Sequence, residues 1–163
     1  MRYRFGSGID IHRFCSSRPL ILGGVTIPFD KGLQGHSDAD VLTHAIIDAL
    51  LGASALGDIG THFPDTDAQY KDISSLILLE KTREMVVSVG FRVSQIDATV
   101  ITQAPRLLPF IPEIRHSLAD CLQIPVGDIS VKAKTTEGLG FIGSGEGIAA
   151  LATATLVMLG TSR

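Results

Sequence analysis

Cysteine is scarce in this sequence. The 163 residues contain only Cys15 and Cys121, and neither belongs to a Cys-x-x-Cys pair. This count excludes a disulfide framework and a zinc site built from thiolates, and it fits a protein of a reducing cytoplasm.

An excess of positive charge is also missing. Fourteen Lys and Arg stand against 17 Asp and Glu, so the formal net charge is -3. We expect no general nucleic-acid-binding surface, because binding to a phosphate backbone requires a basic patch. A local basic pocket for a small phosphorylated ligand is compatible with this balance.

Long apolar runs are absent as well. No stretch has the length needed to cross a bilayer, and residues 1–5 lack the apolar core of a signal peptide. The sequence therefore predicts a soluble protein with no membrane partner. It favours a bacterial cytoplasmic protein over a processed plastid form.

Hydrophobic residues make up 45% of the chain and charged residues only 19%. The length is typical of one domain with a sizeable core. The small charged fraction leaves little charge to cover the surface of a monomer. We therefore expect a single domain over residues 1–163 and a buried oligomer interface.

The spacing of apolar and turn residues predicts an α/β fold of the α+β type, with one mainly β-sheet layer packed against about three helices. Strands are expected over residues 2–14, 20–22, 25–27, 91–102 and 129–135. Helices are expected over residues 38–56, 73–89 and 110–122, with Ser37 or Asp38 capping the first and Pro112 in the first turn of the last. Loops are expected over residues 32–37, 57–67 and 138–147. Residues 148–159 are apolar on both faces and fit a strand or a helix, and their β-branched residues favour a strand.

Two histidine-containing stretches indicate a metal site. Side chains alternate along a strand, so Asp10 and His12 point to the same face. His44 follows in a helical segment, on the same face as Asp40. One carboxylate and two imidazoles give three ligands and an open fourth position, the arrangement of a catalytic zinc. The alternative is that the aspartate ends a strand and both histidines are structural.

Two loops carry side chains suited to a polar ligand. Asp58, Asp65 and Asp67 lie beside glycines, where carboxylates accept hydrogen bonds from sugar hydroxyls or position a second cation. Ordinary turn chemistry is the alternative. Arg106, in a proline-stiffened loop, suits a phosphate or a base, and the alternative is a rigid connector.

A third stretch combines cations and hydroxyls. Lys132, Lys134 and Thr135 suit phosphate oxygens, and Glu137 suits a hard cation such as Mg²⁺. A solvated strand end is the alternative for the lysines. The spacing matches neither a P-loop nor a dinucleotide motif, and it reveals no Ser-His-Asp or Cys-His nucleophile. Together these stretches predict metal-assisted phosphoryl chemistry on a small ligand.

The same residues resemble the family of 2-C-methyl-D-erythritol 2,4-cyclodiphosphate synthases over nearly the whole length. The motifs that carry the resemblance occur in the family's order: Gly8-Ile9-Asp10-Ile11-His12, Gly23-Gly24, His36-Ser37-Asp38-Ala39-Asp40-Val41, His44, Asp48-Ala49-Leu50-Leu51-Gly52-Ala53, Gly57-Asp58-Ile59-Gly60, Phe63-Pro64-Asp65-Thr66-Asp67, Gln103-Ala104-Pro105, Thr135-Thr136-Glu137, Gly140-Phe141 and Gly145-Glu146-Gly147.

This resemblance implies a homotrimer with active sites between adjacent subunits. It implies that Asp10, His12 and His44 hold Zn²⁺, or another divalent transition metal, and that Glu137 is the protein ligand of Mg²⁺ or Mn²⁺. The implied catalytic residues are Asp10, His36, Thr135 and Glu137. The implied substrate-binding residues are His36, Ser37, Asp58, Ile59, Gly60, Phe63 and Asp65 for the methylerythritol phosphate portion, and Thr102, Ala104, Arg106, Leu107, Leu108, Ala133, Lys134, Thr135 and Thr136 for the cytidine diphosphate portion, which the neighbouring subunit would bind.

The implied reaction converts 4-diphosphocytidyl-2-C-methyl-D-erythritol 2-phosphate to 2-C-methyl-D-erythritol 2,4-cyclodiphosphate and CMP, in the non-mevalonate route to isoprenoids. A zinc-containing nucleotide-binding module without turnover and a metal-dependent phosphohydrolase are the alternatives. Two positions depart from the family's usual pattern. Ser144 stands where relatives often carry the Arg that lines a cavity on the trimer axis, and Lys134 stands where relatives often carry Thr.

Overall fold

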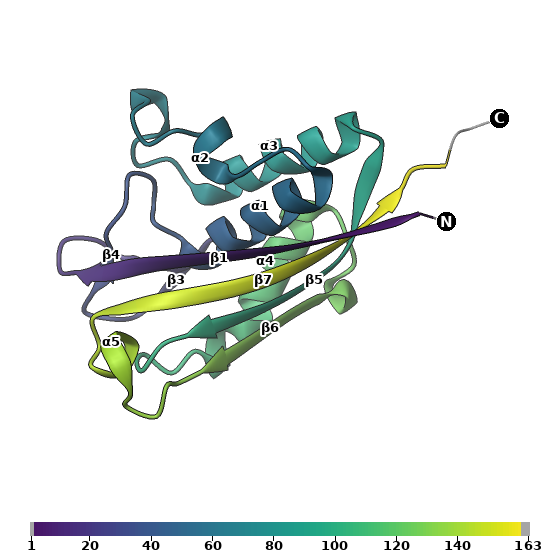
Figure 1. Cartoon of the computed structure of the whole chain (residues 1–163). Coiled ribbons are helices and arrows are strands. Elements are labelled where there is room, and N and C mark those ends of the chain that lie inside the picture. The colour runs from purple at the N-terminus through teal and green to yellow at the C-terminus, as the bar shows by residue number, and fades with distance from the viewer. Residues whose placement is uncertain (1, 161–163) are drawn as a thin grey trace.

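A five-stranded mixed sheet runs the length of the molecule (Figure 1). The computed structural model describes residues 2–160 of the chain. The strand order is β4 (Gly32–Leu33), β1 (Tyr3–Cys15), β7 (Gly147–Met158), β5 (Phe91–Ile101) and β6 (Ile129–Lys134). β7 is antiparallel to both β1 and β5, whereas β5 and β6 are parallel. A separate hairpin joins β2 (Leu20–Leu22) to β3 (Val25–Ile27) through Gly23 and Gly24, and both strands lie where they were expected.

The segment that fits a strand or a helix by its sequence is the central strand, β7. Its register pairs Leu151 with Ile9 of β1 on one side and with Thr99 of β5 on the other. Ala150 and Ala152 are buried on the face that the helices cover. The opposite face carries Leu151, which is exposed, so the sequence of β7 lacks a clear alternation of apolar and polar residues. The preference for a strand is confirmed.

Three helices lie close to the expected positions: α1 (Val41–Ser54), α3 (Ser75–Ser88) and α4 (Ile111–Leu122), with Pro112 in the first turn of α4. Two further helices, α2 (Ile59–His62) and α5 (Gly140–Gly143), occur where loops were expected, so the expected count of about three helices was too low for the described residues. The 3₁₀ turns η1 (Ala68–Tyr70), η2 (Leu108–Phe110) and η3 (Val126–Asp128) complete the elements. A four-residue helix has too few positions to show a period of 3.6 residues.

The prediction that Ser37 or Asp38 caps α1 was wrong, because Asp40 is the cap. The carboxylate of Asp40 accepts from the backbone N–H of Thr43 at 3.0 Å, and it also accepts from Gly23 and Gly24 at 3.0 and 2.8 Å. Asp40 is fully buried and ties the β2–β3 hairpin to the start of α1. It therefore serves the fold, although it lies one helical turn from His44.

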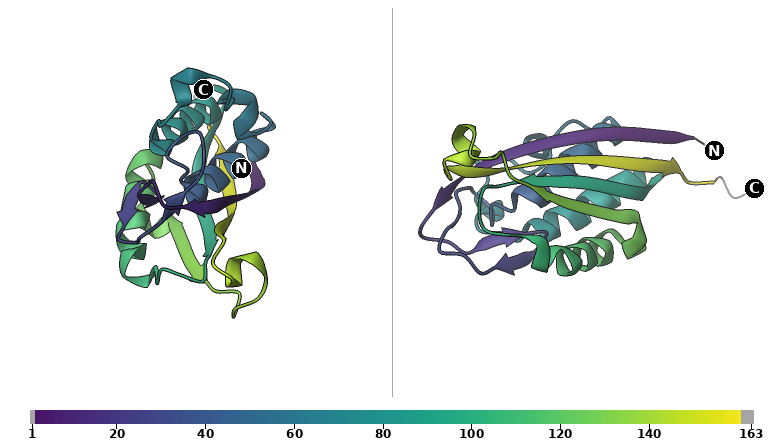
Figure 2. Two further views of the ribbon diagram at one scale, coloured as in Figure 1. Left: turned by 90° about the vertical axis from the view of Figure 1, so that its left-hand side faces the viewer. Right: turned by 90° about the horizontal axis from the view of Figure 1, so that it is seen from below.

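The helices α1, α3 and α4 cover one face of the sheet, and over residues 2–160 the opposite side has only the short helix α5, at one end of the strands (Figure 2). Two glycines of β1 let α1 approach closely. A Cβ on Gly6 would lie 2.1 Å from the carbonyl oxygen of Ala49, and a Cβ on Gly8 would lie 2.1 Å from that of Ala45. Asp10 and His12 continue this face of β1, so the contact leads directly to the candidate site.

No helix within residues 2–160 combines the length and the apolar character that spanning a membrane would require.

Candidate metal centre and ligand pockets

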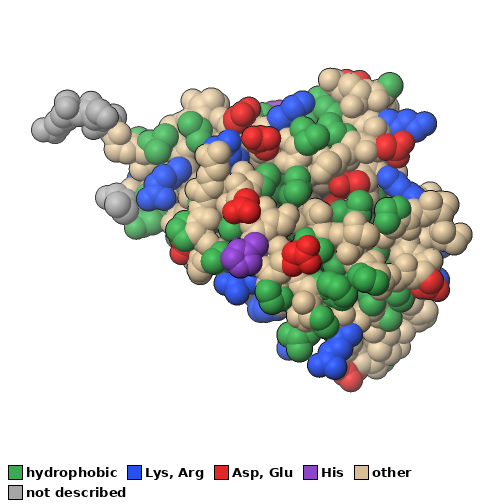
Figure 3. Space-filling view, turned by 180° about the vertical axis from the view of Figure 1, so that it is seen from behind, with side chains coloured by type: hydrophobic (Ala, Val, Ile, Leu, Met, Phe, Trp, Pro, Cys, Tyr) green, Lys and Arg blue, Asp and Glu red, His purple; other side chains and the backbone are tan. Residues whose placement is uncertain are grey.

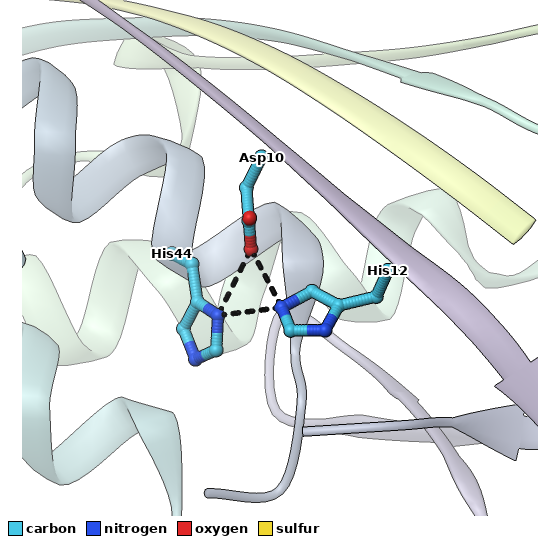
Figure 4. Close-up of side chains that lie close together, drawn as sticks. All are labelled: Asp10, His12 and His44. Atoms are coloured by element: carbon cyan, nitrogen blue, oxygen red, sulfur yellow. Dashed lines mark hydrogen bonds and ion pairs between the residues drawn. The ribbon is translucent and has the colours of Figure 1, made fainter. Parts of the chain in front are cut away.

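Three predicted metal ligands converge on one point (Figure 4). Asp10 and His12 point from β1 toward α1, and His44 points back from the first turn of α1. Oδ2 of Asp10 lies 2.9 Å from Nε2 of His12 and 3.0 Å from Nδ1 of His44, and the two ring nitrogens are 3.3 Å apart. The alternation along the strand thus placed both β1 residues correctly.

The geometry of this triad fits a tetrahedral metal ion. Ligand atoms about 2.0–2.1 Å from a tetrahedral zinc lie roughly 3.3 Å from one another, close to the observed separations. Nδ1 of His12 lies 2.5 Å from the carbonyl oxygen of Gln34. A carbonyl only accepts hydrogen bonds, so Nδ1 carries a hydrogen, and in the neutral ring the lone pair is on Nε2, the atom that faces Asp10. The site therefore presents a carboxylate and imidazole lone pairs toward one position.

The charges of the triad reinforce one another. Burial opposes ionisation of Asp10, but the interactions of its carboxylate with the rings of His12 and His44 outweigh it and hold the pKa of this carboxyl well below its usual range. Burial also opposes protonation of His12, and the hydrogen bond and charge of Asp10 outweigh that effect and raise the pKa of His12. Asp10 is thus an anion to which a cation, either a metal ion or a protonated imidazole, is attracted.

A cavity of about 420 Å³ opens beside the triad. Besides the three ligands it is lined by residues 35–37, by Ile59 and Gly60 of α2, and by a group of loop and helix residues: Phe63, Pro64, Asp65, Tyr70 and Leu78. The predicted residues His36, Ser37, Ile59, Gly60, Phe63 and Asp65 are all among them. Gly35, Pro64, Tyr70 and Leu78 were not predicted as site residues. Tyr70 packs edge-on against Phe63 with ring centroids 5.5 Å apart, a contact between loops that no local motif reveals.

Asp58 is not among the residues that line this cavity. Its Oδ1 accepts from the N–H and the hydroxyl of Thr61 at 2.9 and 2.8 Å, so it caps the short helix α2. Asp48, one helical turn after His44 on α1, accepts from the N–H of Ile59 at 2.8 Å. These two carboxylates hold α2 beside the triad.

A second hollow of about 620 Å³ lies between the ends of β5 and β6 and the start of α4. It contains most of the residues predicted to bind cytidine diphosphate: Thr102, Arg106, Leu107, Leu108, Ala133, Lys134 and Thr135. Gln103, Pro105, Ile111, Val131 and Lys132 also line it. Ala104 and Thr136 are not among its lining residues. The hydroxyl of Thr102 donates to the carbonyl of Ala104 at 2.5 Å, which holds the loop after β5.

The two hollows share no lining residue. Glu137 lies outside both and outside the metal-ligand cluster, exposed on the loop after β6, where its carboxylate accepts from the hydroxyl of Thr135 at 2.9 Å. Within one chain, therefore, the predicted metal ligands of β1 and α1 do not meet the predicted cytidine pocket. Ser144, the departure noted above, donates to Glu146 at 2.8 Å.

Comparison with known proteins identifies the family. The model of the YgbB family matches residues 3–157. A 2-C-methyl-D-erythritol 2,4-cyclodiphosphate synthase of Syntrophobacter fumaroxidans is 56% identical over 153 residues, which is 94% of this chain and 96% of the relative.

Solved structures agree with this assignment. The bifunctional IspDF of Campylobacter jejuni is similar with a TM-score of 0.95 and 42% identity, over 99% of this chain, which spans 44% of that longer protein. A Plasmodium falciparum IspF in complex with CDP is similar with a TM-score of 0.86 and 34% identity, over 97% of both chains. The motifs predicted the family correctly: the chain belongs to the YgbB family of 2-C-methyl-D-erythritol 2,4-cyclodiphosphate synthases, which are lyases.

Proposed function

We propose that this protein cyclises 4-diphosphocytidyl-2-C-methyl-D-erythritol 2-phosphate to 2-C-methyl-D-erythritol 2,4-cyclodiphosphate, releasing CMP. The observation that carries the proposal is the convergence of Asp10, His12 and His44 beside an open cavity. Residues 1–163 would form one synthase domain, of which residues 1 and 161–163 lie outside the described structure, and the enzyme would act in the bacterial cytoplasm.

The reaction joins two anionic groups of one substrate. An oxygen of the 2-phosphate attacks the β-phosphorus in line, the bond from that phosphorus to the CMP oxygen breaks, and CMP leaves with the electron pair. The protein's task is to hold the attacking oxygen and the phosphorus in line, and no protein nucleophile is needed. Metal ions held by Asp10, His12 and His44 and by Glu137 would neutralise the phosphates and stabilise the charge that develops at phosphorus.

The two hollows divide the recognition of the substrate. In the cavity beside the triad, His36, Ser37 and Asp65 would contact the methylerythritol phosphate portion, as would the backbone of Ile59 and Gly60. Asp58 would contribute from the α2 cap. His36 is already oriented, because its Nε2 lies 2.9 Å from the carbonyl oxygen of Asp67.

The larger hollow suits the cytidine diphosphate portion. Lys134 and Arg106 supply cations for phosphate oxygens, Thr135 supplies a hydroxyl, and the apolar floor includes Leu107. The CDP complex of the Plasmodium falciparum relative supports this ligand class. Ala104 and Thr136 would contribute from the adjoining loops, and Glu137 would complete the pocket as the ligand of Mg²⁺ or Mn²⁺.

We propose a homotrimer in which each active site combines the triad cavity of one subunit with the larger hollow of its neighbour. The separation of the two hollows within one chain supports this arrangement. The face of the sheet opposite to α1, α3 and α4 also supports it, because it exposes Phe5, Ile9 and Leu151 by 75, 59 and 45%. The helix-covered side instead carries Lys, Arg, Asp and Glu scattered among hydrophobic side chains (Figure 3).

Phosphorus NMR of the reaction tests the proposed activity. The protein would be incubated with the diphosphocytidyl substrate and Mg²⁺, with and without a chelator. We expect CMP and a cyclic diphosphate to appear and both to be lost on chelation. Inorganic phosphate in place of the cyclic product would assign a hydrolase, and no turnover by metal-replete protein would assign a binding module.

A further inference from the structure

The side of His44 that faces away from the triad contacts two buried hydroxyls. Nε2 of His44 lies 2.8 Å from Oγ of Ser75 and 3.1 Å from Oγ of Ser37. Ser75 is the first residue of α3 and is completely buried, and Ser37 is nearly so. Helix α3 thus contacts the candidate metal ligand through the side chain of Ser75.

The hydroxyl hydrogen of Ser75 is committed elsewhere. Its Oγ makes a short hydrogen bond to Oδ1 of Asp38, and its backbone N–H donates to Oδ2 of the same carboxylate at 2.9 Å. A carboxylate only accepts, so the single hydroxyl hydrogen points to Asp38. Ser75 therefore has only lone pairs to offer to His44.

This commitment determines the tautomer of His44. A 2.8 Å contact between Nε2 and an oxygen with no hydrogen to give requires that Nε2 carry the hydrogen and donate it. The lone pair of the neutral ring is then on Nδ1, the atom that faces Asp10 and His12. The hydrogen bonds from Asp38 through Ser75 to His44 thus place the hydrogen of His44 on its outer nitrogen. The carbonyl of Gln34 has the same effect on His12.

We propose that Ser75 and Asp38 are positioning residues that hold His44 in its metal-binding tautomer and orientation. This inference rests on the proposed metal site. It concerns two residues that are neither metal ligands nor substrate-binding residues in the proposed function. A role limited to capping α3 would not need the hydroxyl, because the bond that Asp38 makes to the start of the helix comes from the backbone N–H of Ser75.

Metal affinity of matched serine variants tests this inference. Ser74, the preceding residue, makes no side-chain capping bond and provides the control. We would measure the Zn²⁺ dissociation constants of the metal-stripped wild type, Ser75→Ala, Ser74→Ala and His44→Ala by chelator competition. Co²⁺ absorption would report the ligand geometry, and thermal unfolding of each metal-free protein would report its stability.

We expect Ser75→Ala to weaken Zn²⁺ binding about 10- to 100-fold and alter the Co²⁺ spectrum, while Ser74→Ala leaves both unchanged. Asp38→Asn should shift the affinity in the same direction, which keeps the test usable if Ser75→Ala does not fold.

If His44→Ala loses the metal but Ser75→Ala and Asp38→Asn bind as the control does, the positioning role is wrong and the metal site stands. If His44→Ala binds as wild type does, the metal site itself is wrong. A loss of affinity that only follows a fall in metal-free stability would assign a structural role and overturn the inference.

Discussion

In each imidazole of the triad, one ring nitrogen faces Asp10 and the other faces away from it. The group that contacts the outer nitrogen determines which nitrogen carries the hydrogen. Nδ1 of His12 faces the carbonyl of Gln34, and Nε2 of His44 faces buried hydroxyls. Both inner nitrogens therefore turn toward Asp10. The ligand residues were predictable from the strand alternation at Asp10 and His12. Their outer partners were not, because Gln34 and Ser75 are brought to the site by tertiary packing.

The cysteines provide a prediction at the same scale. Burial raises the pKa of the Cys121 thiol to about 11, with a further contribution from the negative charge of Glu80, and the thiol donates to the carbonyl of Leu76 at 3.3 Å. The raised pKa keeps Cys121 protonated and unreactive at neutral pH, since the thiolate is the nucleophile. We expect alkylation of Cys121 by iodoacetamide, followed by peptide mass spectrometry, to keep accelerating above pH 10. A rate that levels off by pH 9 would contradict the effect of burial.

The pairing of β1 with α1 is the structural basis of the metal centre. Gly6 and Gly8 bring the backbone of α1 against the strand, and the next two positions on this face are Asp10 and His12. α1 begins at the Asp40 cap, so His44 lies in its first turn, level with the end of the strand face. The distance between the histidines depends on how closely these two elements pack.

Gly8→Ala tests this dependence. The added Cβ would meet the backbone of α1 at Ala45 and Ala49, which cannot move without shifting the helix. We expect a loss of about 1–3 kcal/mol in the free energy of unfolding, measured with denaturant, together with weaker metal binding. Gly127→Ala is the control, because its Cβ would meet nothing within 4 Å. Equal stabilities of the two variants would show that the close approach is unimportant.

The elements differ in how readily the sequence predicts them. Long periodic segments such as α3 and β5 were predictable to within a few residues, and the β-branched residues of β7 correctly favoured a strand. The short elements β4, α2 and α5 were not predictable. The cap of α1 was misjudged by two or three residues, although the capping bond of Asp40 to Thr43 is local; the contacts of Asp40 with Gly23 and Gly24, which are distant in sequence, were not predictable.

The two faces of the sheet differ in what covers them. The helices α1, α3 and α4 cover one face of the sheet (Figure 2). The other face exposes apolar side chains of β1 and β7. Such a surface is typical of an interface between subunits. The low charge content of the sequence indicated an interface, but its location required the structure, because Ile9 and Ile11 read equally well as core residues of a strand.

Ile9→Asp tests the role of this face. Ile9 is 59% exposed on the side of β1 opposite Asp10, so the substitution would place a charge in the proposed interface without altering the core. We expect the proposed trimer to dissociate in sedimentation velocity experiments, because an unpaired charge is costly to bury. Ile77→Asp on α3, where the side chain is 45% exposed on the helix-covered side, should leave the trimer intact. Identical sedimentation of both variants would exclude this face as the interface.

An active site shared between subunits is tested most directly by mixing two inactive variants. His44→Ala removes a ligand from the triad cavity, and the double variant Arg106→Ala/Thr135→Ala removes two groups from the larger hollow. In a trimer that contains both kinds of subunit, only one of the three interfaces would combine an intact cavity with an intact hollow. Random assembly of equal amounts makes about three quarters of the trimers mixed, and each mixed trimer has one intact site of three. Co-expression should therefore restore about a quarter of the wild-type rate of CMP release. Mixed trimers as inactive as either variant alone would contradict a site formed between neighbouring subunits.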